Sequence, residues 1–295
     1  MRHVQPDFKV LYLVPSKNVQ SKWRDRELPA FIRDNIRIDG PAKRSGSADP
    51  ASAVACSNVE EWVHTARTQR HVRDTFLRFS ALSFELSEDQ DKQRQRVAKL
   101  AEIAGIDINL GNTTKKGRFK ARAAEIVNAV LPRYDLIAVD EAHPLKDGTG
   151  LNASDRAQFM ARSLGALGTG GHRRFRGALL LSGTPFDRDL KQFSRQLQVF
   201  ALSDNRNAPY RQIEDLADQR RQGMKWHDIH KGLAPFLVRR VQKMLIGGTL
   251  LSRNQYRREH RETAAISLLK SASDPKAAKQ RLFTALVQKR LIDYL

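Results

Sequence analysis

The chain has 295 residues, of which 40% are hydrophobic and 28% charged, so it can bury a core in one large domain or two modest ones. Lysine and arginine number 52 against 32 acidic residues, which leaves a formal net charge of +20. The sequence excludes an internal disulfide, because Cys56 is the only cysteine, and it offers neither tetrahedral zinc spacing nor an apolar run long enough to cross a bilayer.

The positive charge predicts a polyanionic partner, because phosphate backbones release counterions when basic surfaces bind them. A basic protein from a GC-rich, arginine-favouring genome is the alternative. Met1 to Leu13 carries charged residues where a signal peptide would need an apolar run. We therefore expect a cytoplasmic protein with no membrane partner.

The first predicted element is a buried strand in KVLYLVPSK, residues 9–17, which Pro15 stops. Apolar residues then recur at helical spacing from Val19 to Phe31, and Pro29 should end or kink that helix near its third turn. Residues 40–53 are rich in Gly, Pro, Ser and Ala, which predicts a flexible surface loop.

Strands and helices continue to alternate along the next part of the chain. The predictions are a helix at 59–69, a strand at 75–84, a helix that Ser87 and Gln90 open as a capping box and that runs toward Ile103, a basic loop at 111–123 leading into a helix, a strand at 136–139, a helix at 154–167, a loop at 168–177 and a strand at 178–181. This alternation predicts parallel βαβ units in a doubly wound α/β sheet.

Beyond Leu202 the pattern changes to short helical stretches without another strong strand, and a final helix is expected at 273–295. We therefore predict a sheet domain at 1–204 and a helical extension at 205–295.

The stretch LIAVDEAHPL, residues 136–145, places two acids directly after an apolar run. A strand of that kind is buried on both faces, and ligands of open α/β sheets bind at the carboxyl ends of the strands. Asp140 could hold Mg²⁺ through water, and Glu141 could polarise an attacking water. A solvent-facing acidic turn is the alternative.

Four segments together resemble the motifs of superfamily-two helicases, and in particular the Swi/Snf-like DNA translocases. DEAH resembles the Walker B motif, and SGTPF after the strand at 178–181 resembles the third motif. VLYLVPSKNVQSKW resembles motif Ia, and LAPFLVRRVQK at 233–243 resembles the "pFmlRR" segment of that family. The resemblance implies a RecA-like first lobe, most simply from a bacterial member.

Functional roles follow from this resemblance residue by residue. Asp140 would coordinate the Mg²⁺ of bound ATP, Glu141 would act as base toward water, and His143 would relay the nucleotide state. Ser182, Gly183 and Thr184 would couple hydrolysis to movement along duplex DNA. The residues that would contact DNA are Pro15, Ser16, Lys17, Arg239 and Arg240, although a paired arginine on a helix is as often a solvated face.

One departure from the family is clear, because a phosphate loop ends in Gly-Lys-Thr or Gly-Lys-Ser and the dipeptide Gly-Lys does not occur in this sequence. In the family this loop precedes motif Ia, so its strand is expected beyond the amino-terminal end, and the second lobe is expected beyond Leu295. Two functions remain open: part of an ATP-dependent DNA translocase, and a catalytically inactive, basic DNA-binding or scaffolding fragment of one.

Two other patterns predict no site. His227 and His230 lie one helical turn apart without a third metal ligand nearby in sequence. GALGTGG at 165–171 lacks the lysine and hydroxyl of a phosphate loop.

Overall fold

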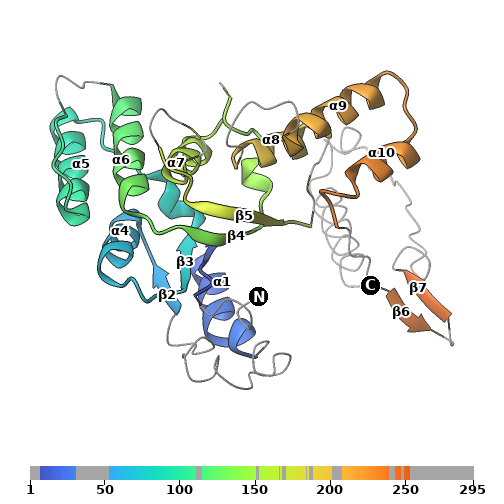
Figure 1. Ribbon diagram of the computed structural model, residues 1–295, viewed down its shortest axis with the longest axis horizontal. Coiled ribbons are helices and arrows are strands. Elements are labelled where there is room, and N and C mark those ends of the chain that lie inside the picture. The colour runs from blue at the N-terminus through green and yellow to red at the C-terminus, as the bar shows by residue number, and fades with distance from the viewer. Residues whose placement is uncertain are drawn as a thin grey trace, which may run out of the picture. The chain divides into compact units, whose positions relative to one another are not determined.

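A five-stranded, all-parallel sheet forms the centre of the computed structural model (Figure 1). The strand order is β2-β3-β1-β4-β5, and the strands are β1 (Val10–Val14), β2 (Ala53–Cys56), β3 (Asp74–Arg78), β4 (Tyr134–Asp140) and β5 (Phe175–Leu181). In the register Leu13 lies opposite Leu77 of β3 and Val139 of β4. The prediction of a parallel α/β sheet is therefore confirmed.

The structure describes residues 7–30, 53–110, 115–150, 153–165, 167, 171–183, 185, 189–200, 208–238, 243–246 and 249–252. The chain divides into two compact units, Met1–Leu237 and Val238–Leu295. This division lies further along the chain than the composition change near residue 204, because helices that follow that change pack within the first unit.

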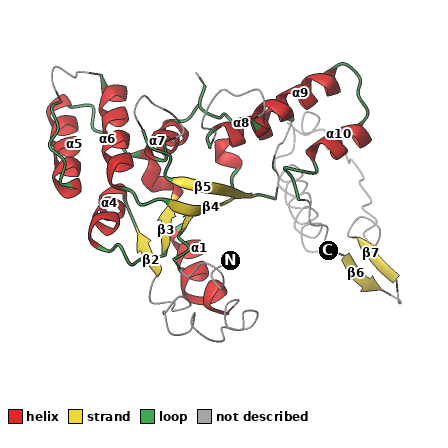
Figure 2. Ribbon diagram, viewed as in Figure 1, coloured by secondary structure: helices red, strands yellow, loops and turns green. Residues whose placement is uncertain are grey.

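Helices connect the parallel strands, as parallel pairing requires. They are α1 (Lys17–Lys22) with the π-helical turn η1 (Trp23–Glu27), α4 (Val59–Thr68), the 3₁₀ turn η3 (Phe79–Ser83), α5 (Gln90–Ala104), α6 (Lys116–Val130), the 3₁₀ turn η4 (His143–Leu145) and α7 (Asp155–Ser163). Figure 2 shows α7 and α1 on opposite sides of the sheet. Both faces thus carry helices, as in a doubly wound sheet.

One face of the sheet carries the main core. Leu11, Leu13 and Val139 point to this face and are fully buried together with apolar side chains of α4, α5, α6 and α7. On the other face Tyr12 stacks on Phe76, with ring centroids 4.4 Å apart.

The cover of this second face does not extend to the β5 edge. In the registers Leu179 of β5 shares a face with Ala138 and Tyr12, and Leu179 is 47% exposed. Within the described residues β5 pairs only with β4, so its other edge is open. The second face is therefore covered at β1 and β3 but not at β5.

Local sequence explains the helix boundaries. Ser16, Asn58 and Ser154 cap α1, α4 and α7, each accepting a hydrogen bond from the backbone N–H three residues on. The distortion predicted at Pro29 takes the form of η1, where the N–H of Leu28 bonds to the carbonyl of Trp23. Proline has no N–H for the regular bond to Asp25, so the preceding turn widens.

Three sequence predictions in this unit were wrong. The N-cap of α5 is Asp89, whose carboxylate accepts from the N–H of Asp91 at 2.9 Å, and not Ser87 of the expected capping box. The loop expected up to Ala53 gives way to β2, a strand that was missed because it has only four residues, two of them alanine. The strand expected at 75–84 ends at Arg78, where η3 begins.

A buried asparagine fixes the chain ahead of β5. Asn128 of α6 donates through Nδ2 to the carbonyls of Ser163, at 2.9 Å, and His172, at 2.8 Å, and its Oδ1 accepts from the N–H of His172. Gly165 has a φ of +83°, and a Cβ there would lie 2.1 Å from the carbonyl oxygen of His172. The glycine segment at 165–171 thus meets a structural need at Gly165.

Three further helices, α8 (Lys191–Gln198), α9 (Pro209–Arg221) and α10 (Trp226–Leu233), share a second small core of Leu190, Phe193, Ile213, Ala217, Ile229 and Leu233. Gly232 permits the close approach of α9, because a Cβ at this position would meet Leu216 at 2.6 Å.

The second unit contains an antiparallel pair of strands, β6 (Lys243–Ile246) and β7 (Thr249–Ser252). The expectation of no strand beyond Leu202 was therefore wrong. The sequence held a signal for it, because Gly-Gly between two short apolar runs is typical of a hairpin. The helix expected at 273–295 lies outside the described residues.

Candidate functional site

Three neighbouring strand ends bring most of the predicted residues to one edge of the sheet. Residues 15–17 follow β1, Asp140 ends β4, and Ser182 follows β5. The chain leaves β1 toward β2 and leaves β4 toward β5, in opposite directions along the sheet. In open α/β sheets, ligands bind in the crevice at such a reversal, so this edge is the candidate site.

Asp140 is half-buried at the end of β4. Burial raises the pKa of its carboxyl above the ordinary value, and the neighbouring charge of Glu141 raises it further, although a backbone hydrogen bond from Glu141 opposes the shift. The carboxylate is thus held where its charge is poorly compensated by the protein. A bound cation would compensate that charge.

Glu141 has a φ of +53°, in the left-handed region that side chains other than glycine rarely adopt. Its Oε2 lies 3.4 Å from Nδ1 of His143, and both side chains are about half exposed. Strain of this kind in a residue at a strand end is typical of functional sites, because the surrounding contacts must hold it in place. Nothing in the sequence predicted this conformation.

A backbone hydrogen bond joins the two motif-bearing loops. The N–H of Ala142 donates to the carbonyl of Leu181 at 3.0 Å, and Ala142 itself is fully buried. Ser182 is half-buried and Gly183 is exposed with open space where a Cβ would lie. The structure therefore brings Glu141 and Ser182 to adjoining ends of β4 and β5, whereas Thr184 lies outside the described residues.

Two buried glutamines bond to backbone carbonyls of the sheet and of the loop after β5, and no sequence pattern pointed to either. Gln196 of α8 is 2% exposed and donates through Nε2 to the carbonyl of Pro185, at 2.5 Å. Gln20 of α1 donates to the carbonyls of Phe76, in the middle of β3, at 2.9 Å, and of Cys56, at the end of β2, at 3.2 Å. A glutamine within an amphipathic helix gives no sequence signal of such a role.

The predicted DNA-contacting residues are only partly described. Pro15, Ser16 and Lys17 are all exposed at the start of α1. The hydroxyl of Ser16 accepts from the N–H of Val19, at 3.3 Å, so this side chain serves as a helix cap. Arg239 and Arg240 lie outside the described residues.

The carboxylates at this edge suit a cation that needs few protein ligands and keeps most of its coordinated water. Among the described residues, no group of three or more His, Cys, Asp or Glu side chains could hold a metal ion. Asp140 and Glu141 could still hold Mg²⁺, which usually binds through one or two carboxylates, water and substrate phosphates.

Two cavities lie away from this edge. One, of about 820 Å³, opens between α4 and α5 and is lined by residues that include Glu60, His64 and Lys99. The other, of about 290 Å³, is lined by residues that include Lys9, Arg70 and Arg174, near the amino-terminal ends of β1, β4 and β5. Neither contains a residue that the sequence singled out for chemistry.

No protein-family model, no curated protein and no solved structure matches this chain. The class of fold therefore rests on the structure alone: an α/β protein with an all-parallel sheet and carboxylates at the strand ends. None of the helices in the described ranges combines the length and the apolar character that a membrane crossing requires.

Proposed function

We propose that this chain is part of an ATP-dependent DNA translocase of the Swi/Snf-like type, in which it supplies a RecA-like first lobe. One observation carries the proposal: Asp140, Glu141 and Ser182 lie at adjoining carboxyl ends of neighbouring parallel strands. The sequence places the DEAH and SGTP motifs at these two strand ends, and an acidic turn without chemistry would not need a second motif beside it.

In this proposal the roles of the site residues follow from their chemistry. Asp140 holds Mg²⁺ through water, and the ion neutralises charge on the phosphates of ATP when both are bound. Glu141 accepts a proton from the attacking water, and His143 lies close enough to sense its charge state. Ser182, Gly183 and Thr184 couple the nucleotide state to DNA, and Lys17 contacts a DNA phosphate near Pro15 and Ser16, as Arg239 and Arg240 would further along the chain.

The open edge of β5 supports the idea that another segment completes the lobe. In the family that the motifs resemble, the phosphate-loop strand lies beside the strand that ends at Ser182 here, and no Gly-Lys dipeptide exists in the chain to supply one. The N–H of Leu136 donates to the carbonyl of Lys9 on the β1 side, so the alternation of the parallel ladder turns the backbone groups of Gly177 and Leu179 toward β4 and those of Ala178 and Leu180 toward the open edge. A strand added there would pair with the groups of Ala178 and Leu180 and cover Leu179.

The decisive experiment restores the missing parts. The coding DNA on either side of this chain should be searched for a strand followed by a Gly-Lys-Thr or Gly-Lys-Ser loop, and for a second lobe, and the assembled protein assayed for ATP hydrolysis with and without duplex DNA. We expect DNA-stimulated turnover that is abolished in Asp140→Asn and Glu141→Gln. It should be retained in Asp147→Asn, a variant of an exposed acid seven residues after Asp140. Turnover unaffected by the first two variants would refute the proposed roles.

A basic DNA-binding or scaffolding module without catalysis is the second candidate, and the net charge of +20 favours it for the isolated chain. Such a module should bind duplex DNA with little sequence preference. If it neutralises about six phosphates, its affinity should fall on the order of a thousandfold between 50 and 200 mM salt. An affinity that is flat across this range would remove the basis for this candidate.

A further inference from the structure

Trp226 opens α10 with its indole largely in solvent. The side chain is 45% exposed, and it is the one aromatic among the exposed large apolar residues of the described chain. The small core that α10 shares with α8 and α9 is filled by Ile229 and Leu233, which are 0% and 2% exposed. The indole is therefore not needed to fill that core, and its exposure calls for another explanation.

Arg220 and His230 lie beside the ring of Trp226. The guanidinium carbon of Arg220 lies 4.9 Å from the centroid of the Trp226 ring, and Nη1 of Arg220 donates to the carbonyl of Met224 at 3.1 Å. The ring of His230, one helical turn further along α10, lies 5.9 Å from that of Trp226. Lys225 and Lys231 are exposed at either end of the same short stretch.

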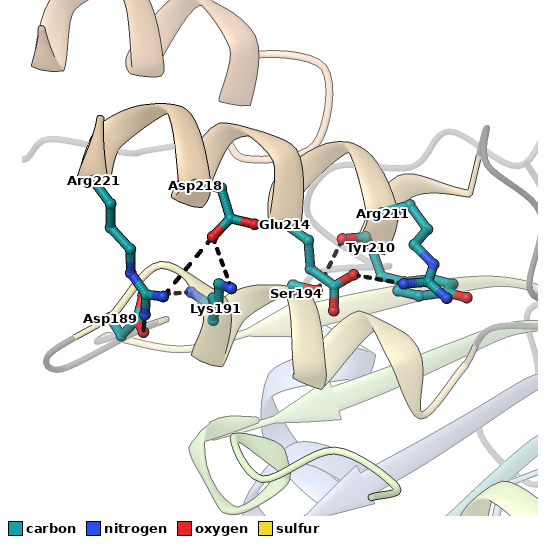
Figure 3. Close-up of polar contacts among 8 residues, drawn as sticks. All are labelled: Asp189, Lys191, Ser194, Tyr210, Arg211, Glu214, Asp218 and Arg221. Atoms are coloured by element: carbon teal, nitrogen blue, oxygen red, sulfur yellow. Dashed lines mark hydrogen bonds and ion pairs between the residues drawn. The ribbon is translucent and has the colours of Figure 1, made fainter. Parts of the chain in front are cut away.

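Two of the three acids of α9, Glu214 and Asp218, are paired with basic residues other than those beside Trp226, and the third, Asp215, is exposed. Asp218 bonds to Lys191 of α8 at 2.8 Å, Arg221 to Asp189 at 2.6 Å, and Arg211 to Glu214 at 3.2 Å (Figure 3). The bond from Lys191 holds the pKa of Asp218 below its ordinary value, so this carboxylate stays ionised and paired.

Arg220 contacts the indole, and Lys225 is the exposed residue directly before Trp226. Within α10, Asp228 and Lys231 lie two and five residues from Trp226, where helical geometry directs both to faces other than that of the indole. The surface formed by Arg220, Lys225, Trp226 and His230 is named here the Trp226 platform.

We propose that the Trp226 platform binds single-stranded nucleic acid, with an unpaired base stacked on the indole and the cations against the flanking phosphates. An aromatic ring accepts any base, because every base has a flat π face, and lysine and arginine attract the backbone without reading its sequence. Arg220 covers part of the indole and keeps it oriented, so the ring is already in place before the ligand arrives.

A duplex cannot use this platform, since its bases are already stacked on one another. The inference therefore goes beyond the proposed contact of duplex DNA at the strand ends, and stacking on Trp226 needs neither ATP nor Mg²⁺.

The test measures binding of a fluorescein-labelled twelve-residue oligo-dT and of a labelled hairpin duplex to the full chain, by anisotropy without nucleotide. We expect Trp226→Ala to weaken oligo-dT binding about tenfold and duplex binding less than twofold, which corresponds to one stacked base. Trp226→Phe should retain part of the affinity. Oligo-U in place of oligo-dT distinguishes an RNA ligand from a DNA ligand.

Intrinsic fluorescence gives an independent readout. The chain has three tryptophans, and Trp62 is 1% exposed, so the variant Trp23→Phe leaves Trp226 as the one emitter that a ligand could stack on. We expect oligo-dT to quench this variant strongly. Thermal melting of Trp226→Ala checks that the fold is retained.

An equal loss of single-stranded and duplex binding in Trp226→Ala, or no loss of either, would overturn the proposal, as would a lack of quenching. The oligo-dT measurement uses neither nucleotide nor Mg²⁺, so a failure of the ATPase proposal and a failure of the Trp226 platform are distinguishable.

Discussion

Tyr134 and Asp140 begin and end the same strand, β4, yet the two ends differ in burial, hydrogen bonding and charge. The hydroxyl of Tyr134 is buried and accepts from the indole N–H of Trp62 at 3.0 Å. Asp140 is half-buried, next to a second carboxylate on a strained backbone. One end of the strand is thus built for stability and the other gives up stability for exposed chemical groups, as a functional strand end would.

The largest effect should come from the buried end. We expect Trp62→Ala to lower the free energy of unfolding by about 3 to 5 kcal/mol, because it empties a fully buried site and removes the indole N–H that donates to the hydroxyl of Tyr134. Urea denaturation followed by circular dichroism measures this. Trp226→Ala, at an exposed tryptophan, is the matched control and should cost about 1 kcal/mol or less. Equal losses would contradict the comparison.

The second largest effect should come from alkaline pH, which should destabilise the buried end of β4. Burial raises the pKa of Tyr134 from 10.0 to about 12, and that of Cys56 from 9.0 to about 11. The unfolded chain loses these protons at the lower pH, so their contribution is complete below pH 9 and is lost as pH rises toward 12. Tyr134 alone should account for about 2 to 3 kcal/mol.

Urea titrations between pH 8 and 12 would measure this loss of stability. Tyr134→Phe should show a shallower decline above pH 10, because it lacks the ionisable hydroxyl. A decline of the same steepness in both proteins would mean that Tyr134 does not contribute.

At the exposed end a substitution should stabilise the protein. Glu141→Gly should raise the free energy of unfolding by up to about 1 kcal/mol, since glycine adopts a φ of +53° without the steric cost that a side chain has there. Glu141→Ala keeps the Cβ and should bring no such gain, so it is the control. If both variants gave the same stability, the backbone at Glu141 would carry no strain.

The smallest effect is expected at Asp140. Asp140→Asn should stabilise the protein at pH 7 by less than about 0.5 kcal/mol, because solvent screens a group that is only half-buried. The raised pKa of Asp140 means that folding disfavours its charged form, so the difference between the two proteins should shrink as pH falls and the carboxyl becomes protonated. A gain that grows at low pH would contradict this sign.

The elements that sequence predicted well are those with a strong local signal. The long apolar runs of β1 and β4 marked buried parallel strands. That of β5 correctly marked a strand, but the expectation that it is buried was wrong, because β5 is an edge strand of the described sheet, with Leu179 47% exposed. The acids after Val139 marked a strand end, so the position of Asp140 beside the end of β5 could be foreseen. β2 could not, because AVAC is too short and too weakly apolar to be told from a loop without its partner β3.

The contacts that shape the site depend on tertiary partners and have no local signal. Gln20 and Gln196 look like solvent-facing helix residues until the strands and loops that they bond to are in place. The positive φ of Glu141 likewise arises where the chain leaves β4 and Ala142 bonds to Leu181. The exposure of Trp226 depends on how α10 packs against α9.

The hydrogen bonds of Asn128 bear on how this protein could change in length. The side chain of Asn128 forms hydrogen bonds with the backbone of Ser163 and of His172, on either side of the segment from 165 to 171. The start of β5 is therefore positioned by α6 and not by this segment. Residues added or deleted near position 168 should leave the register of β5 against β4 unaltered. This makes the segment a suitable place to insert an affinity tag or a fluorescent domain, and a place where related chains would be expected to differ in length.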